Sequence, residues 1–134
     1  MIFDDTSINP NNLSPITLAF VGDAVYSLIV REELALTSDK KANELHKICA
    51  GRVSAVSQYE AMQSIMDNLT EEELGVFKRG RNAATSHTPK NASSRDYHYA
   101  TGFESLFGYL YLSRKYDRIK ELYSLICQKS EQKK

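Results

Sequence analysis

Two acidic residues lie within strongly apolar segments of this 134-residue sequence, and they are the residues best suited to do chemistry. Asp23 stands in the segment AFVGDAVYSLIV, and Glu104 stands in TGFESLFGYLYL. An ionised carboxylate in apolar surroundings is costly unless a partner or a metal compensates its charge. Two carboxylates that converge form a natural site for Mg²⁺, a hard cation that takes oxygen ligands and keeps several waters. The pattern therefore predicts a metal site at Asp23 and Glu104.

Small residues flank both acids at helical spacing. Ala19 and Gly22 lie near Asp23, and Gly108 follows Glu104 by one turn. Because glycine inside a helix costs about 1 kcal/mol relative to alanine, it usually has a packing reason. Here it would let two helices approach closely and bring the carboxylates together. The spacing leaves a second interpretation open, in which each acid is only paired with an arginine or bonded to Tyr and Ser hydroxyls in the core.

The segments that carry the two acids are predicted to be helices. Ser14 and Pro15 favour a helix start, and the run that follows, ITLAFVGDAVYSLIVREEL, is apolar on nearly every side, which predicts a buried central helix. A second apolar helix, YATGFESLFGYLYLS, carries Glu104. The other expected helices are ANELHKICA ending at Gly51, RVSAVSQYEAMQSIM, one running from the T-x-x-E capping box at Thr70 towards Arg79, and one over about Asp117 to Cys127. No segment alternates like a strand, so the predicted fold class is all-α.

Length and composition indicate a single domain. A chain of 134 residues with 42% apolar residues suffices for one core, predicted over about 13–127, with a flexible tail at 128–134. Cys49 and Cys127 are far apart and form no C-x-x-C pair, so we expect free thiols in a reducing cytoplasm. The sequence has neither a basic leader nor an apolar run of the roughly 20 residues that span a bilayer, which predicts a cytoplasmic protein.

The overall charge of zero hides a basic segment. The balance of 17 basic and 17 acidic residues argues by itself against a protein that coats nucleic acid. Between residues 78 and 98, however, five Lys and Arg oppose only Asp96, which gives 5 − 1 = +4. Much of this segment falls in 81–96, a stretch predicted to be irregular because it is rich in Ser, Thr, Asn and Ala.

The basic segment suits contacts to phosphate and ribose, through which duplex RNA is largely recognised. The predicted RNA-binding residues are Lys78, Arg79, Arg81, Asn82, Lys90 and Arg95. A solvated loop whose charges bind nothing is the alternative.

Both apolar segments resemble conserved blocks of the ribonuclease III catalytic domain. LAFVGDAVYSLIV resembles the block whose Gly-Asp-Ala-Val core carries a metal-binding aspartate, and ATGFESLFGYLYL resembles the block whose Phe-Glu-Ala-Leu-hydrophobic-Gly pattern carries a metal-binding glutamate. The stretches RGRNA and PKNA resemble mini-ribonuclease III, a compact bacterial branch without a double-stranded-RNA-binding domain. The matches span roughly residues 13–127, in the family's order and separation.

The resemblance implies that Asp23 and Glu104 are the catalytic, metal-binding residues of a Mg²⁺-dependent endoribonuclease, in which Mn²⁺ can substitute. It also implies an all-helical homodimer with a duplex-binding groove across both subunits and one active site in each. The expected reaction cleaves a phosphodiester in each strand of double-stranded RNA, leaving 5′-phosphate and 3′-hydroxyl ends. The expected substrate is a precursor of large-subunit (23S) ribosomal RNA. The rivals are a non-catalytic RNA-binding or ribosome-associated protein on the same fold and a helical interaction module without RNA.

The sequence departs from the wider family at two positions. That family has further acids one turn before the aspartate and three residues before the glutamate, and these positions are Ala19 and Thr101 here. We therefore expect fewer protein ligands, with water completing the coordination, and the number of metal ions stays open. Without a separate RNA-binding domain, affinity is expected to come from the catalytic dimer itself, through the basic residues of 79–95.

Overall fold

The computed structural model describes residues 9–85 and 93–132, which form only helices. In chain order these are η1 (Pro10–Asn12), α1 (Pro15–Thr37), α2 (Ala42–Arg52), α3 (Ala55–Ile65), η2 (Met66–Asn68), α4 (Glu71–Ala83), α5 (Ser94–Leu112) and α6 (Tyr116–Gln132). The predicted all-α class is thus confirmed. None of the helices in these two ranges is long and apolar enough to cross a membrane.

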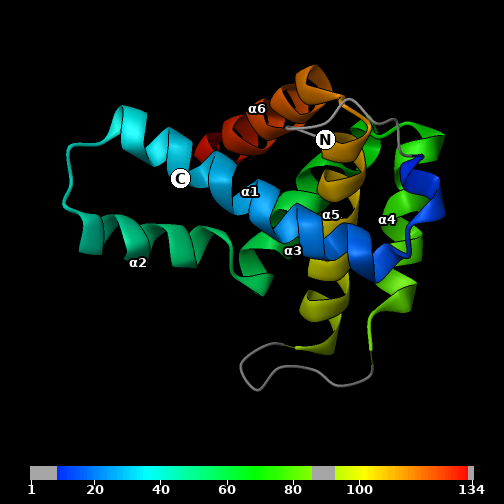
Figure 1. The fold of residues 1–134 in the computed structure, drawn as a ribbon. Coiled ribbons are helices and arrows are strands. Elements are labelled where there is room, and N and C mark those ends of the chain that lie inside the picture. Colours follow the sequence, from blue (N-terminus) through cyan, green and yellow to red (C-terminus); the bar gives the residue numbers. More distant parts are fainter. Residues whose placement is uncertain (1–8, 86–92, 133–134) are drawn as a thin grey trace.

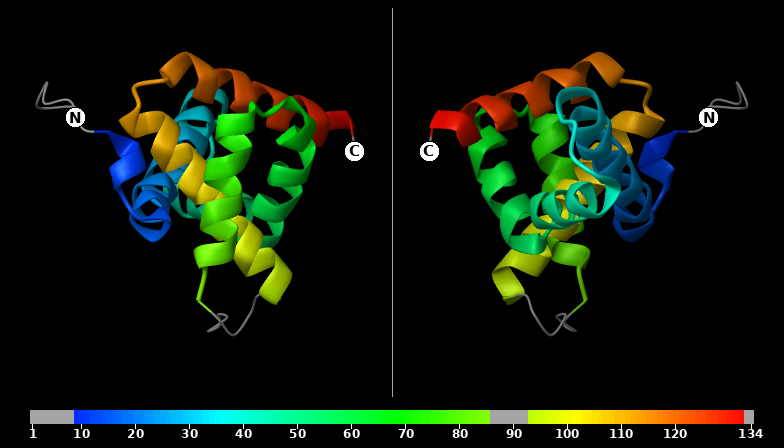
Figure 2. Two further views of the ribbon diagram at one scale, coloured as in Figure 1. Left: turned by 90° about the vertical axis from the view of Figure 1, so that its right-hand side faces the viewer. Right: turned by 90° about the vertical axis from the view of Figure 1, so that its left-hand side faces the viewer.

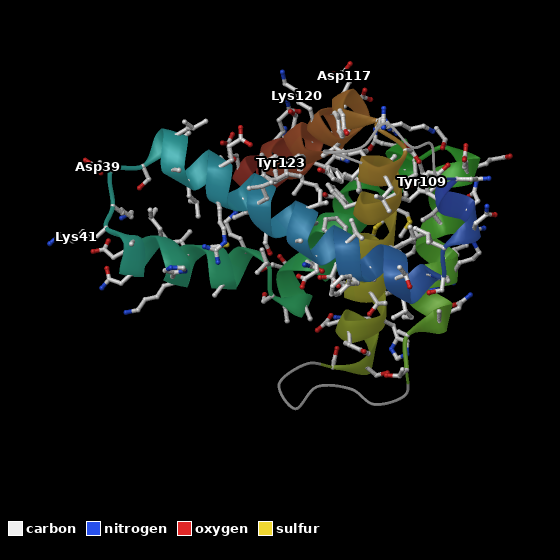
Figure 3. All side chains as sticks on the ribbon, viewed as in Figure 1. Asp39, Lys41, Tyr109, Asp117, Lys120 and Tyr123 are labelled. Atoms are coloured by element: carbon white, nitrogen blue, oxygen red, sulfur yellow. The ribbon has the colours of Figure 1, made fainter. Side chains whose placement is uncertain are left out.

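Helix α5 is the centre of the bundle. It contacts α1, α3, α4 and α6, and α1 crosses it in the middle of the molecule (Figure 1). Helix α6 packs on α3 and α5 and covers one end of the bundle (Figure 2). The second half of α1 and α2 run side by side as an arm, with Asp39 and Lys41 at its tip (Figure 3). The two predicted site acids therefore belong to the two helices that cross at the centre.

Local capping signals fix where the helices begin. The Ser14 hydroxyl accepts a hydrogen bond from the Thr17 amide at 3.1 Å, and Pro15 occupies the first turn of α1. At α4, the Thr70 hydroxyl accepts from the Glu73 amide at 3.1 Å, while the Glu73 carboxylate accepts from the Thr70 amide at 2.9 Å. Each such cap stabilises a helix by about 1 kcal/mol. Both starts confirm the sequence prediction.

The core fixes the rotation of α1 and α5 about their axes. Tyr26 of α1 meets Phe103 and Phe107 of α5 edge to face, with ring centroids 4.8 and 5.3 Å apart. Such pairs add about 0.5–1.5 kcal/mol beyond their area burial. Because Tyr26 follows Asp23 by three residues and Phe103 immediately precedes Glu104, this packing also sets where the two carboxylates point. Among the described residues, those with no exposed surface are Val30, Met62, Ile65, Phe77, Phe103, Ser105, Leu106, Phe107, Leu110 and Leu122.

The prediction that α1 is buried on nearly every side is wrong. Leu18, Tyr26 and Val30 face the core, but Phe20 is 80% exposed and Leu28 is 65% exposed. Within residues 9–85 and 93–132, the other helices pack against one side of α1, and Phe20 and Leu28 on its other side are exposed. An apolar sequence on nearly every side of α1 therefore does not mean that every side is buried.

Two further boundaries differ from the sequence expectation. Helix α4 runs to Ala83 and α5 begins at Ser94, so both ends of the stretch 81–96 are helical. Helix α5 starts early because the Ser93 hydroxyl accepts from the Asp96 amide at 3.1 Å. Helix α6 reaches Gln132, so most of the predicted flexible tail, 128–134, is helical.

Contacts to α3 explain this continuation of α6. The Lys129 ammonium of α6 donates a hydrogen bond to the Ser64 carbonyl of α3. Most helical stability in proteins comes from tertiary packing, and this bond ties the last turns of α6 to α3.

Candidate active site

Asp23 and Glu104 come together where α1 crosses α5. Burial, and after it the neighbouring Asp23 carboxylate, raises the pKa of Glu104 to about 8. The two side chains are also within hydrogen-bonding reach, which raises the same pKa further. The predicted convergence of the two acids is confirmed. Their binding of a metal stays a prediction.

The burial of the two acids is unequal. Glu104 is half-buried between the helices, whereas Asp23 is exposed on the open side of α1. The expectation that both acids stand in the core is therefore wrong for Asp23. The site combines one carboxylate anchored in the bundle with one that faces the surface, where a large substrate can reach it.

Two glycines make this close crossing possible, as the sequence predicted. A Cβ atom on Gly22 would lie 1.7 Å from the Glu104 carbonyl oxygen, and one on Gly108 would lie 1.9 Å from the Leu18 carbonyl oxygen. Real Cβ atoms do not approach backbone oxygens so closely. The backbones of α1 and α5 are thus in direct contact, and only glycine fits at both positions.

Helix α3 brings a third polar residue to the site. Gln58 is 2% exposed, and its Nε2 donates hydrogen bonds to the Val53 carbonyl at 3.2 Å and to Glu104 Oε2 at 3.5 Å. Its Oε1 has no hydrogen-bond partner among the described residues. Gln58 was not predicted, because nothing in this mixed segment of the sequence distinguishes it from Gln63, which is exposed on the same helix.

The residues present fit a hard divalent cation. Both carboxylates offer oxygen ligands, and a cation beside them would offset the repulsion by Asp23 that, after burial, raises the Glu104 pKa. The side chain of Gln58, which contacts Glu104, has a buried amide oxygen that accepts no hydrogen bond from the described residues. In the part of the chain that the structure describes, no group of three or more His, Cys, Asp or Glu side chains is arranged to hold a metal. Such a cation would therefore keep several waters.

The two positions that depart from the wider family supply no acid to the site. Ala19 is buried against the bundle. Thr101 is also buried, and its hydroxyl donates to the Tyr97 carbonyl at 2.9 Å within α5. Neither position therefore adds a carboxylate to Asp23 and Glu104 in the folded site.

The raised pKa of Glu104 makes the stability of the metal-free protein depend on pH. This pKa is about 8 in the folded chain and 4.5 for an ordinary glutamate, so the stabilising contribution is complete below pH 4.5 and is lost as pH rises through 8. Glu104→Gln mimics the protonated form. We expect its melting temperature in EDTA to exceed that of the wild type by a margin that grows from pH 6 to pH 9, measured by scanning calorimetry. A margin that is constant with pH would contradict the raised pKa.

A shallow hollow of about 450 Å³ lies between the end of α4 and the start of α5. It brings together three of the predicted RNA-binding residues, Arg81, Asn82 and Arg95. His98 also lines it, as do Ser94 and Tyr99. The last two were not predicted, although their positions near the start of a helix beside Arg95 could have indicated them.

The other predicted RNA-binding residues lie elsewhere. Lys78 and Arg79 are exposed on α4 but do not line the hollow, and Lys90 lies outside the described residues.

The cations of the hollow are held in place by neighbouring side chains. The Arg95 guanidinium lies 4.0 Å from the ring centroid of Tyr59 and 3.3 Å from Asp96 Oδ1. Arg81 lies over the Phe77 ring at 5.6 Å, and its Nε donates to Asn82 Oδ1 at 3.2 Å. An arginine that is already oriented loses less side-chain freedom when it binds an anion. The hollow is thus suited to phosphate groups.

Comparisons with known proteins identify the family of this chain. The Ribonuclease III domain model matches residues 16–115. The chain is 47% identical over 119 residues to Mini-ribonuclease 3 of Brevibacillus brevis, and the match covers 89% of each protein. It is 44% identical over 121 residues to Mini-ribonuclease 3 of a Thermoanaerobacter species, covering 90% of this chain and 85% of that one. A solved structure of a Fusobacterium nucleatum protein matches with a TM-score of 0.79 at 28% identity, covering 89% of this chain and 95% of that one. The chain therefore belongs to the ribonuclease III family of endoribonucleases, in its Mini-ribonuclease 3 branch.

Proposed function

We propose that this protein is a Mg²⁺-dependent endonuclease that cleaves double-stranded RNA, with Asp23 and Glu104 as its catalytic, metal-binding residues. The observation that carries the proposal is the convergence of these two carboxylates at the crossing of α1 and α5. Mn²⁺ is expected to replace Mg²⁺. The products carry 5′-phosphate and 3′-hydroxyl ends. The substrate is a precursor of 23S ribosomal RNA in the cytoplasm, a compartment with which the free thiols of Cys49 and Cys127 agree.

In this mechanism the protein's task is placement. A bound Mg²⁺ would lower the pKa of a coordinated water and stabilise charge on the phosphate and the leaving oxygen. Glu104 is half-buried in the bundle and fixes the position of the site. Asp23 is exposed, so the site opens at the protein surface. Because the Glu104 pKa is about 8, this residue must release a proton before it can act as a ligand near neutral pH. Arg81, Asn82 and Arg95 orient the strand, since placement supplies much of the rate.

A cleavage assay tests the proposed function. A perfect duplex from a large-subunit ribosomal RNA precursor and each of its single strands are incubated with the protein in Mg²⁺, in Mn²⁺ and in EDTA. We expect cleavage of the duplex only, with both metal ions, and 5′-phosphate ends on the products. A non-catalytic RNA-binding protein would instead hold the duplex equally well in EDTA and never cut it. A helical module without RNA would have no salt-sensitive affinity for the duplex at all.

The open side of α1 supports the homodimer that the family resemblance implies. Ile16, Phe20 and Leu28 are large, exposed apolar side chains on this helix, which also carries the exposed Asp23. A contiguous exposed apolar surface on a small domain marks an interaction site. A two-fold contact through this surface would place the two copies of Asp23 near one groove, as a nuclease that cuts both strands requires.

Phe20→Lys is expected to separate the dimer into monomers. Phe20 is 80% exposed in the monomer, so the substitution leaves the core intact and places a charge in the proposed interface. Light scattering coupled to size-exclusion chromatography measures the change in mass. Tyr116→Lys is the matched control, because Tyr116 is 51% exposed but lies on α6. Equal masses for Phe20→Lys and the wild type would contradict an interface through α1.

Arg95→Ala is expected to weaken the binding of duplex RNA roughly tenfold, because charge-assisted hydrogen bonds contribute about 1.5–3 kcal/mol. If Arg95 contacts one phosphate, the slope of log K against log salt should fall by about 1 as well. Fluorescence anisotropy in EDTA over a range of salt concentrations measures both effects without cleavage. Lys120→Ala removes an equivalent charge from the outer side of α6 (Figure 3) and should change neither the affinity nor the slope.

A further inference from the structure

Gln58 is a buried polar side chain, and the packing of the helices alone does not explain why a glutamine stands there. It is 2% exposed and belongs to α3, a helix that carries neither of the two acids. Its Nε2 lies between two oxygen acceptors, the Val53 carbonyl at 3.2 Å and Glu104 Oε2 at 3.5 Å. Turning the amide over would place Oε1 against the Val53 carbonyl oxygen, which carries no proton to donate. The orientation of the amide group is therefore fixed by its neighbours.

This orientation leaves the amide oxygen of Gln58 buried without a donor. It is the one buried side-chain nitrogen or oxygen within residues 9–85 and 93–132 that has no hydrogen-bond partner. A buried acceptor without a partner destabilises a fold, and natural structures rarely keep one without a reason. A methionine would fill nearly the same volume and remove the unsatisfied oxygen, at the cost of the hydrogen bond to the Val53 carbonyl. The cost of keeping a glutamine here therefore suggests a role outside the stability of the metal-free fold.

We propose that Gln58 is a positioning residue of the metal site, an inference that rests on the proposed function. Its amide nitrogen holds one oxygen of the Glu104 carboxylate and so orients this ligand. Its amide oxygen would accept a hydrogen bond from a water coordinated to the bound cation. This water would be the donor that Oε1 lacks in the metal-free protein. Residues that orient a metal ligand commonly change metal affinity by 10- to 100-fold when they are replaced.

Metal binding without RNA tests this role separately from cleavage. The affinity for Mn²⁺ is measured by calorimetry on the wild type, on Gln58→Met and on Gln63→Met, in which an exposed glutamine of the same helix is replaced. We expect Gln58→Met to bind Mn²⁺ at least tenfold more weakly and Gln63→Met to bind as the wild type does. The melting temperature of metal-free Gln58→Met should equal or exceed that of the wild type. In a Glu104→Gln background, Gln58→Met should have no further effect on Mn²⁺ affinity.

Each outcome distinguishes the two proposals. If the wild type binds no Mn²⁺, or if Asp23→Asn binds it unchanged, the proposed metal site itself fails. If the wild type binds Mn²⁺ and Gln58→Met binds it equally well, only the role of Gln58 is overturned. Weaker binding together with a lower melting temperature would make Gln58 a structural residue and would also overturn it.

A measurement on the wild type covers the case in which Gln58→Met does not fold. Addition of Mg²⁺ to the ¹⁵N-labelled protein should shift the side-chain amide resonance of Gln58. A resonance that stays in place while the protein binds Mg²⁺ would overturn the proposal.

Discussion

Glu104→Gln and Asp23→Asn are each expected to lower the rate of RNA cleavage by about 10³-fold or more. Each substitution keeps the shape of the side chain but removes one of the two carboxylates that are proposed to bind the metal. Metal-ion catalysis is worth several kcal/mol of charge stabilisation, and about 1.36 kcal/mol corresponds to a factor of ten in rate. Single-turnover cleavage of duplex RNA in saturating Mg²⁺ measures the loss.

Binding and folding controls separate this chemical effect from indirect ones. Both variants should bind duplex RNA in EDTA at least as tightly as the wild type, because removing a negative charge does not weaken contacts to phosphate. Glu60→Gln removes an exposed carboxylate from α3 and should cleave normally. Cleavage that survives either Glu104→Gln or Asp23→Asn would overturn the assignment of the catalytic residues.

The parts of this structure that the sequence predicted depend on local signals. The start of α1 follows from a capping serine and a proline, and the start of α4 follows from the reciprocal bonds of Thr70 and Glu73. The close crossing of α1 and α5 follows from Gly22 and Gly108, because glycine in a helix is costly unless another backbone occupies the space of its Cβ. A similar local pattern, Ser93 followed by Asp96, marked the true start of α5 and was overlooked.

The parts that were not predicted depend on how distant elements pack. Periodicity cannot distinguish a helix buried on all sides from one with a second apolar face open to a partner, so Asp23 was expected in the core although it is exposed. The role of Gln58 likewise depends on α3 packing against α5, which places its amide beside Glu104. Neither the exposure of Asp23 nor the position of Gln58 can be predicted from the residues adjacent in sequence.

Gly22→Ala is expected to destabilise the protein by about 3 kcal/mol, at the upper end of the usual cost of overpacking, and to lower its melting temperature by roughly 10 °C. The added Cβ would lie 1.7 Å from the Glu104 carbonyl oxygen, which belongs to backbone and cannot rotate away. Helices α1 and α5 must therefore separate. Because the same crossing holds the carboxylates of Asp23 and Glu104 together, cleavage should fall as well, and a displacement of about 1 Å can cost 10²-fold in rate.

Gly51→Ala is the matched control for this prediction. Gly51 also lies within a helix, α2, but a Cβ added there meets nothing within 4 Å. The substitution should therefore stabilise the protein by about 0.4–1 kcal/mol, because alanine restricts the unfolded chain more than glycine does. Opposite signs for the two glycines, measured by chemical denaturation, would establish that the backbone contact, rather than helix propensity, sets the cost at Gly22. If Gly22→Ala were as stable and as active as the wild type, the carboxylates could not depend on this contact for their position.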